Sequence, residues 1–171
     1  METRSSTPAG NRRGDSDINQ VGMTQKSATA VVQSLNKALA NYQIFYQNLR
    51  AFHWLVKGHH FFELHEKFEK MYDNASEAID DIAERILTLD GTPLHSYEDY
   101  LKNAEVKSVA NPSGESPMVQ AAIENSQVVL AALRAVIDES AQQGDDGTND
   151  MAIGFARQLE KDIWMLNAWL G

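Results

Sequence analysis

The histidines of this chain are concentrated in one short stretch. Four of the five lie between positions 53 and 65, inside AFHWLVKGHHFFELHEKFEK at 51–70, where several glutamates accompany them. The chain contains no cysteine, which excludes thiolate metal sites and disulfide scaffolds. Imidazole nitrogens and carboxylate oxygens suit iron, zinc or manganese. A catalytic pair or a polar helix end would have the same composition. The choice among these readings depends on the secondary-structure elements that carry the stretch.

Long amphipathic helices are predicted on both sides of a turn near Gly58. Apolar residues recur at three- and four-residue steps from Thr24 onward, and the same period resumes within a few residues after the turn. The second of these helices is expected to stop at the breaker Gly91-Thr92-Pro93. Both exceed the usual length of a globular helix, as the helices of bundles do.

A long connection at 91–116 separates these helices from the rest of the chain. Within it, SYEDYLKNA at 96–104 predicts a short helix that is capped by Ser96. The length of the connection is explained if the segment crosses a helical bundle from end to end.

Two further helices are predicted after this connection. One opens with Pro117 at its first position and continues to about Gln143, before the breaker GDDG. The other is expected to be capped by Thr148 or Asn149. The sequence has no alternating Val/Ile/Thr pattern long enough to form a strand, and it has no internal repeat. We therefore predict an all-α fold, a ferritin-like four-helix bundle with a short helix in the long crossover between helices two and three.

The bundle is expected to occupy residues 24–171 as one domain, preceded by a tail at 1–23. The tail is rich in small polar and charged residues, and we predict that it is disordered because it has little apolar surface to bury. The formal net charge of the chain is -9, which favours cations and opposes binding along a nucleic-acid backbone. Neither a secretory signal nor a membrane-spanning run is visible, so we expect a cytoplasmic protein without a membrane partner.

The turn between the first two helices places His53 and His65 at one level, on antiparallel rods whose axes are roughly 8–10 Å apart. Glu69 lies one turn beyond His65 on the same face. Asp80 and Glu84 form another acidic pair, but Asp80 is about 22 Å from His65 at ~1.5 Å per residue. One chain cannot bring both groups to one ion. Two chains that pair head to tail across a two-fold axis can, with imidazoles from one copy and carboxylates from the other.

A shared site of this kind would have open coordination positions, which fits ferrous iron oxidation better than a closed structural zinc site. The alternative is that the histidines are structural or solvated and that the paired acids belong to a hydrated helix face. Spacing alone leaves both interpretations open.

The same residues resemble the signature of the Dps family, the mini-ferritins named as DNA-binding proteins from starved cells. The most specific parts are FHWLVKG, FFELHEKFE and IDDIAERILTLDGTP, within a resemblance that covers nearly all of residues 24–171. The family pattern has a His before Trp, a second His twelve residues on, an acid four residues later, and D-x-x-x-E within D-x-x-A-E-R. The corresponding residues are His53, His65, Glu69, Asp80 and Glu84. One feature departs from the family pattern: the acid at 69 is usually Asp in the family. The E-x-x-H motif is absent from this chain, which argues against the di-iron site that true ferritins and bacterioferritins form within one subunit.

This resemblance implies a hollow homo-dodecamer that is built from two-fold dimers. It implies a ferroxidase that oxidises Fe(II) with hydrogen peroxide, or else with dioxygen, and stores ferric mineral inside the shell. Those five residues would bind the iron and carry the catalysis, with His53 and His65 on one side and Asp80 and Glu84 on the other. Because iron and peroxide would be consumed together, less hydroxyl radical would form, which would protect against oxidative stress.

Further residues of the resemblance concern a pore and an aromatic neighbour. GDDGTND is similar to the family's pore segment, which implies that Asp146 and Asp150 line a three-fold pore for cations; the family's third pore acid falls at about Ala141. The alternative is a capped loop whose acids suit the helix dipole. Trp54, next to the first histidine, could quench a radical or pack at a subunit interface.

Family members that bind DNA generally do so through basic terminal tails. The arginines of this tail, Arg4, Arg12 and Arg13, are offset by acids, and the chain has no basic extension after the last helix. We therefore expect DNA to be possible but disfavoured as a partner, since only the avidity of many tails could offset the acidic shell. The alternatives to a ferroxidase are a nucleoid DNA-binding protection protein with little iron turnover, and a bundle that sequesters iron or zinc without redox chemistry.

Overall fold

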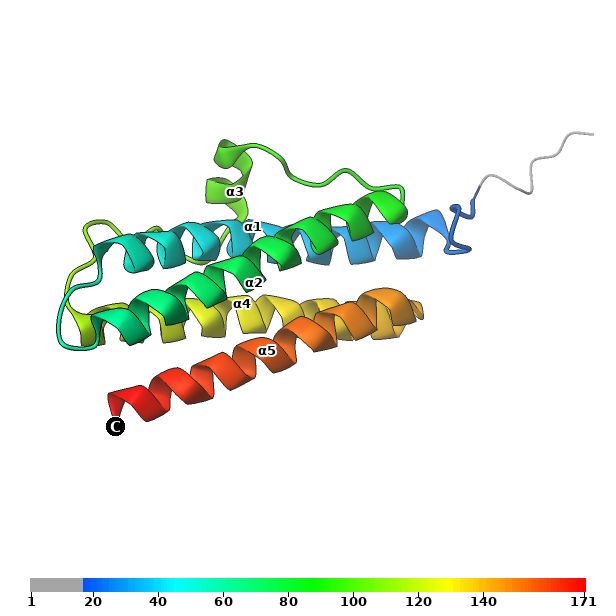
Figure 1. Ribbon diagram of the computed structural model, residues 1–171. Helices are drawn as coiled ribbons and strands as arrows, with labels where there is room; N and C mark the ends of the chain where they lie inside the picture. Colours follow the sequence, from blue (N-terminus) through cyan, green and yellow to red (C-terminus); the bar gives the residue numbers. More distant parts are fainter. Residues whose placement is uncertain (1–16) are drawn as a thin grey trace, which may run out of the picture.

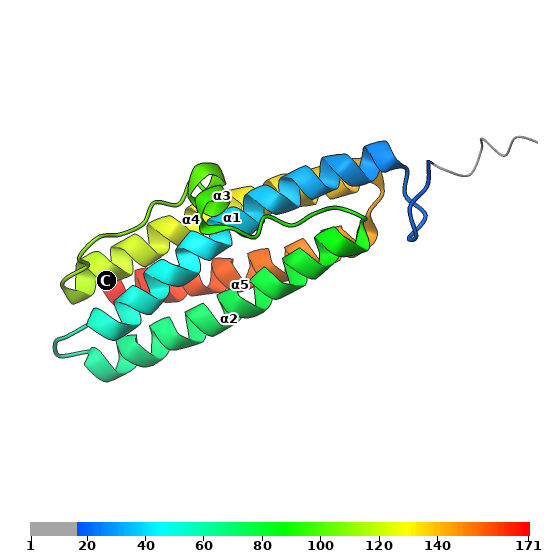
Figure 2. The same ribbon diagram turned by 90° about the horizontal axis from the view of Figure 1, so that it is seen from above.

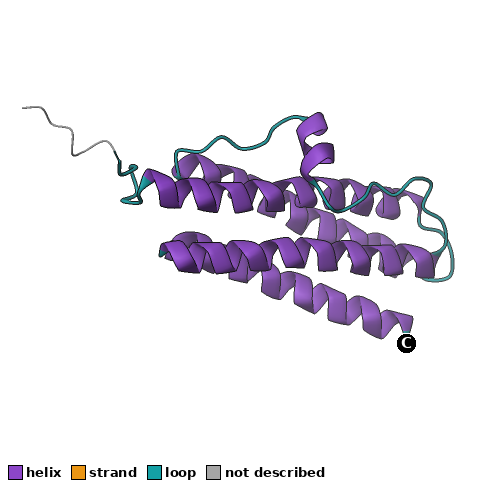
Figure 3. Cartoon of the chain, turned by 180° about the vertical axis from the view of Figure 1, so that it is seen from behind, coloured by secondary structure: helices purple, strands orange, loops and turns teal. Residues whose placement is uncertain are grey.

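The computed structural model describes residues 17–171, which contain five helices and no strand. Their bounds are α1 (Gln25–Leu55), α2 (Phe61–Thr88), α3 (Tyr97–Asn103), α4 (Glu115–Gln143) and α5 (Asp146–Leu170). The long helices run side by side, and short α3 lies against the outer side of α1 (Figures 1 and 2). Short turns join α1 to α2 and α4 to α5, whereas one long loop crosses between the two hairpins (Figure 3). The predicted all-α four-helix bundle, with a short helix in its crossover, is therefore confirmed.

The hydrophobic core lies mainly along α1, which packs against both α2 and α4. Its largest fully buried side chains include Phe45, Phe52 and Phe68, and the rings of Phe52 and Phe68 lie 5.6 Å apart across the α1–α2 hairpin. Burial of each such side chain contributes about 1.5–3 kcal/mol. Helix α5 packs mainly on α4 and contacts α2 much less. None of the helices in residues 17–171 is long and apolar enough to cross a lipid bilayer.

Asparagine side chains on α1 hold the crossover in place. Asn41 Oδ1 accepts the backbone N–H groups of Glu105 and Val106 at 2.8 and 3.0 Å. Asn48 donates to the carbonyl of Lys107 at 2.8 Å. Because Asn41 and Asn48 are buried in the bundle, they replace water as the partners of a chain segment that has no regular backbone pairing. The periodic apolar pattern of α1 gave no indication of this role.

The helix ends confirm some predicted caps and correct others. Ser96 caps α3 as predicted, and its hydroxyl accepts the N–H of Asp99 at 3.2 Å. The prediction that Pro117 stands first in α4 was wrong, because the helix begins at Glu115 after Gly114. Proline is tolerated two residues later because the N–H groups of a first turn lack helical partners in any case.

The predicted cap of the last helix was also wrong. Neither Thr148 nor Asn149 caps α5; the cap is Asp145, whose Oδ1 accepts the N–H of Thr148 at 3.0 Å. Asp145 was read as part of a breaker, although a breaker that ends in an acid also supplies an N-cap. Helix α4 itself ends at Gln143 and is capped by Gly144, whose φ of 69° is in the left-handed region that glycine adopts without strain.

The chain before α1 forms a short turn. Ile18 and Thr24 make an isolated bridge, Asn19 Oδ1 accepts the N–H of Met23 at 2.9 Å, and Thr24 caps α1. Helix α1 thus begins directly after Thr24, and residues 17–23 of the tail, which were predicted to be disordered, form this turn instead. The remainder of that tail, with its three arginines, lies outside the described residues.

Candidate metal centre

His53 and His65 lie against each other where α1 and α2 leave and enter their turn. Their rings are stacked, with centroids 3.7 Å apart and planes inclined by 18°. His53 is buried and His65 is half-buried. The predicted convergence of these two side chains from neighbouring helices is what the structure shows.

Hydrogen bonds fix the protonation of one nitrogen in each ring. Nδ1 of His53 lies 2.9 Å from the carbonyl oxygen of His65, and Nδ1 of His65 lies 2.9 Å from the carbonyl oxygen of His53. A carbonyl only accepts, so both Nδ1 atoms must carry a hydrogen and donate it. In the neutral rings this leaves both Nε2 atoms with a lone pair for a metal.

The helical positions explain why these carbonyls are available. His53 is in the last turn of α1, where carbonyl groups lack a helical N–H partner. His65 lies inside α2, and its carbonyl has a second lone pair beside the one used within the helix. The pair is therefore supported by the backbone of the hairpin itself, without any other polar side chain.

The turn that brings the helices together is held from outside by α4. Glu115 Oε1 accepts the backbone N–H of His60 at 2.7 Å, and its Oε2 lies 3.2 Å from His60 Nδ1. These hydrogen bonds lower the pKa of the Glu115 carboxyl, the backbone bond most. Gly58 permits the close approach, because its φ is 141° and a Cβ there would lie 2.4 Å from Glu115 Oε1. His59 and His60 are exposed in this turn.

Aromatic side chains enclose the histidine pair. Phe61 stacks on His65 with ring centroids 4.9 Å apart, and Tyr72 meets His53 edge-on at 5.3 Å. Burial, followed by the nearby Glu69 carboxylate, raises the pKa of the Tyr72 hydroxyl, which keeps it protonated as a donor. Neither Phe61 nor Tyr72 was predicted as part of the site, although both lie on the His65 face, four residues before and seven after it.

Glu69 does not join the histidines in a three-ligand group. Its side chain is exposed, and Oε1 accepts the Tyr72 hydroxyl at 3.3 Å. Within residues 17–171 no group of three or more histidine, aspartate or glutamate side chains is placed to hold a metal ion. The described part of one copy therefore brings two candidate ligands together, the stacked imidazoles, and no third.

Asp80 and Glu84 lie farther along the same continuous helix as His65. Both are exposed on α2, and no ion pair with a described residue engages either carboxylate. The unbroken helix keeps Asp80 about 22 Å from His65 at ~1.5 Å per residue. The structure thus separates the two groups within one chain, as the spacing predicted, and leaves both acids accessible to another copy.

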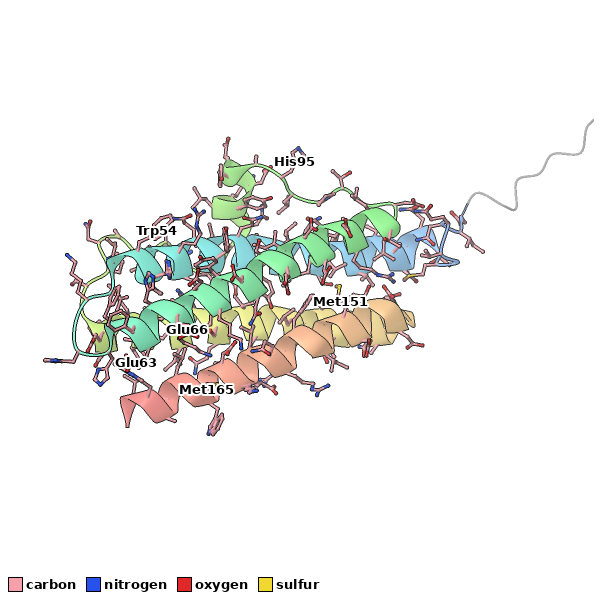
Figure 4. All side chains as sticks on the ribbon, viewed as in Figure 1. Trp54, Glu63, Glu66, His95, Met151 and Met165 are labelled. Atoms are coloured by element: carbon pink, nitrogen blue, oxygen red, sulfur yellow. The ribbon has the colours of Figure 1, made fainter. Side chains whose placement is uncertain are left out.

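Trp54 extends outward beside the buried histidine. It lies at the end of α1 on the side away from α5 (Figure 4), and 56% of its surface is exposed. The Arg50 guanidinium lies 4.7 Å from its ring centroid. A large aromatic group in this position is available for packing against another molecule. His95, the histidine outside the cluster, is exposed in the crossover near α3 (Figure 4).

The predicted pore acids lie at the opposite end of the bundle. Asp146 is in the first turn of α5, and both it and Asp150 are exposed. The neighbouring Asp145 is buried instead, and its Oδ1 pairs with Arg85 Nη2 of α2 at 2.6 Å. This ion pair ties the end of α2 to the start of α5, a role that the acidic segment did not reveal by sequence.

Comparisons with known proteins agree with this arrangement. The ferritin-like domain family matches residues 32–171. The DNA protection during starvation protein of Porphyromonas gingivalis is 40% identical over 148 residues, which cover 86% of this chain and 93% of that protein. General stress protein 20U of Bacillus subtilis is 39% identical over 141 residues, which cover 82% of this chain and 97% of that protein.

A solved structure is similar over almost the whole bundle. It is the Dps protein from Vibrio cholerae O1, described as a member of a broad superfamily of ferritin-like diiron-carboxylate proteins. The match has a TM-score of 0.88 at 38% identity and covers 91% of this chain and 98% of that one. With the bundle, the histidine pair and these relatives taken together, the chain belongs to the Dps family of ferritin-like proteins.

Proposed function

We propose that this protein is a ferroxidase whose active sites are each completed by two copies of the chain. The observation that carries the proposal is the stacked pair of His53 and His65. Their Nδ1 hydrogens are used by the backbone, and within residues 17–171 no third histidine or acid of the same copy completes a group that could hold a metal ion. Open coordination positions are what a metal-oxidising site needs for its substrate.

Each side chain has a distinct role in this proposal. His53 and His65 hold Fe(II) through Nε2 from one copy, and Glu69 assists from the same copy. Asp80 and Glu84 of a second copy supply carboxylates that favour the ferric product, since added negative charge stabilises the higher oxidation state. The exposed aromatic surface of Trp54, beside the buried His53, supports an interface at this position.

The reaction consumes two ferrous ions for each hydrogen peroxide. Each ion gives one electron, the O–O bond breaks, and two protons complete two molecules of water. Paired transfer leaves no hydroxyl radical, which gives the protein a role in protection against oxidative stress. Dioxygen is the alternative oxidant. We further propose a hollow shell of twelve copies that stores the ferric product, with Asp146 and Asp150 at its cation entrances.

The proposal is tested by the double variant Asp80→Ala/Glu84→Ala. Anaerobic Fe(II) is mixed with peroxide, and the soluble ferric absorbance is followed. We expect the initial rate to fall by at least about tenfold, since interactions with charged ligands are lost. Glu124→Ala/Asp138→Ala removes the same charge from exposed positions on α4 and should oxidise iron at the wild-type rate. An unchanged rate in the first variant would remove these acids from the site.

A second candidate function is DNA binding, which is favoured by relatives named DNA protection during starvation protein. The net charge of -9 on each copy opposes it. Gel shifts over a salt series, with the full chain and with a variant lacking residues 1–23, separate the candidates. We expect no shift at ~150 mM salt. A salt-resistant shift that depends on the tail, with background iron oxidation, would favour the DNA-binding alternative.

A further inference from the structure

An apolar groove separates the first part of α2 from the last part of α5. It has a volume of about 330 Å³, and its apolar lining includes Leu64, Leu166 and Trp169. Met165 of α5 and Glu66 of α2 also line it, and Figure 4 shows both at the same end of the bundle. Because α2 and α5 contact each other much less than either contacts its hairpin partner, little direct packing holds the two helices together here.

A buried ion pair joins the two helices beside this groove. Lys67 Nζ of α2 lies 2.6 Å from Oδ1 of Asp162 on α5, and the two side chains are 17% and 5% exposed. Asp162 Oδ2 also accepts the amide of Gln158 at 3.1 Å. Within residues 17–171, the other ion pair that links α2 to α5 is that of Arg85 with Asp145, at the far end of both helices. The attachment of the last part of α5 to α2 therefore depends strongly on Lys67 and Asp162.

The sulfur of Met165 lies next to the same ammonium group. Its Sδ is 3.9 Å from Lys67 Nζ, a distance at which a thioether accepts a weak hydrogen bond. Met165 is 43% exposed, whereas Met71 and Met118 are 2% and 1% exposed. Among the methionines of residues 17–171 it is the one on the surface, and a small oxidant in solution can reach it through the groove.

Hydrogen peroxide converts a methionine thioether into a sulfoxide. A lone pair of the sulfur attacks one peroxide oxygen, the S–O bond forms and the O–O bond breaks. Sulfur loses two electrons and the peroxide gains them. The departing hydroxide takes the proton of the transferred oxygen and becomes water. The product carries a polar oxygen, so a weak acceptor is replaced by a strong one.

We propose that Met165 is a peroxide-sensitive modification site, and that its oxidation weakens the ion pair of Lys67 with Asp162 and loosens α5 from α2. The sulfoxide oxygen stands beside Lys67 Nζ and competes with Asp162 for it. Asp162 then keeps the amide of Gln158 but loses charge compensation, and a buried carboxylate without its cation destabilises the contact. Iron takes no part in this reaction, and the proposed ferroxidase site includes none of these side chains.

The test is peroxide treatment of the assembled, iron-free protein in the presence of a chelator. Peptide mass spectrometry measures the sulfoxide at each methionine, and we expect Met165 to react at least about tenfold faster than Met71 or Met118, because exposure governs access. Amide exchange of residues 160–170 should then become about tenfold faster. Methionine sulfoxide reductase should restore the original exchange rate.

Two variants separate a specific effect from general damage. Met165→Leu has a similar volume and no oxidisable sulfur, so peroxide should leave the exchange of residues 160–170 unchanged. Lys67→Leu/Asp162→Asn removes the ion pair, so oxidation of Met165 should change that exchange by less than about twofold in this background. Circular dichroism and size exclusion establish that each variant retains its fold and assembly, and Met165→Leu alone still tests the proposal if the double variant does not.

Three outcomes would overturn the proposal. Oxidation of Met165 no faster than that of Met71 and Met118 would show that the assembled protein shields it. Equal acceleration of exchange in Met165→Leu would assign the effect to another residue. Equal acceleration in wild type and in Lys67→Leu/Asp162→Asn would show that the sulfoxide acts without the ion pair.

Discussion

Each histidine of the stacked pair has separate uses for its two ring nitrogens. Nδ1 donates to the backbone of the opposite helix and so stabilises the hairpin, while Nε2 is the atom that would bind iron in the proposed site. The structural and the chemical contributions therefore belong to different atoms of one side chain. Substitutions that retain one nitrogen position and remove the other can separate them.

His65→Asn is the substitution that makes this separation. The amide nitrogen of asparagine corresponds in position to Nδ1, so it can still donate to the carbonyl of His53, but nothing replaces Nε2. We expect the free energy of unfolding to remain within about 1 kcal/mol of wild type. Peroxide-dependent iron oxidation should be lost. Thermal denaturation and the ferric absorbance assay measure the two effects.

His65→Gln is the matched control, because its amide nitrogen corresponds to Nε2 and lies too far out to donate to that carbonyl. It should be less stable than His65→Asn. If the two variants are equally unstable, the hydrogen bonds to the backbone do not stabilise the hairpin as described.

Sequence reasoning identified this pair but not its surroundings. Two histidines at equal distances from a turn must converge on antiparallel helices, and this follows from helix geometry alone. Phe61 and Tyr72 were missed because only ligand types were considered, and an aromatic side chain on a bundle helix usually belongs to the core. Which aromatic ring touches an imidazole depends on side-chain rotamers, which the spacing of residues does not fix.

At the scale of elements, the end of α2 and the start of α5 are joined by one buried ion pair. The side chain of Asp145 is 2% exposed and that of Arg85 is 22% exposed. Arg85 also donates from Nε to the hydroxyl of Thr148 at 2.9 Å. The carboxylate thus depends on the arginine for its charge balance, whereas the arginine can reach solvent.

This asymmetry predicts unequal effects of removing either partner. Arg85→Met leaves a buried carboxylate without its cation and should lower the free energy of unfolding by about 3–5 kcal/mol. Asp145→Asn retains a cap-forming oxygen and leaves a cation that water can reach, so its effect should be about 1–2 kcal/mol. Chemical denaturation followed by circular dichroism compares them. A larger effect of Asp145→Asn would contradict the assignment of Asp145 as the desolvated partner.

The turn between α1 and α2 provides a pH-dependent contact. In the folded state the pKa of Glu115 is lowered by the backbone N–H and then by the side chain of His60, so folding favours the carboxylate. Its contribution to stability is therefore fully present above the ordinary value of 4.5 and is lost as the pH falls through the lowered pKa.

Glu115→Gln should remove this dependence. Above pH 5 we expect faster amide exchange of the turn at 57–60 in the variant than in wild type, because the acceptor of the His60 N–H is weaker. The difference should shrink in acid, where wild-type Glu115 is protonated. Hydrogen exchange at matched pH values measures it. A difference that grows as the pH falls would have the wrong sign for a lowered pKa.

The order and type of the helices could be predicted because the three- and four-residue spacing of apolar side chains starts and stops clearly at the ends of each helix. Their caps were predicted less well, since Asp145, Thr148 and Asn149 are all good capping residues and stand close together. The choice among them depends on Arg85, which approaches from another helix. A local rule cannot contain that information. The asparagines that hold the crossover were missed for the same reason.

At the scale of the whole molecule, one copy exposes surface that is typical of a subunit in a larger assembly. Large apolar side chains are exposed at Trp54, Phe62 and Trp164, by 56%, 80% and 67% respectively. Monomeric soluble proteins seldom expose so many large aromatic groups, which supports burial by other copies. The sequence predicted that the imidazoles and the acids that meet at one site come from different copies. Within one copy a straight helix keeps the two groups apart, whatever the details of packing.

Complementation tests this division directly. One variant, His53→Ala/His65→Ala, retains the acids; the other, Asp80→Ala/Glu84→Ala, retains the imidazoles. Each alone should oxidise iron at about a tenth of the wild-type rate or less. In a mixed two-fold dimer, one site contains both defects and the other combines intact imidazoles with intact acids, because each site draws on both copies. Dissociating and reassembling an equal mixture should pair unlike copies in about half of the dimers, so about one quarter of the wild-type activity should return.

The ferric absorbance assay measures the recovery, with each variant reassembled alone as its control. A site built within one chain would give no recovery, because every copy in the mixture would still lack part of its ligand set.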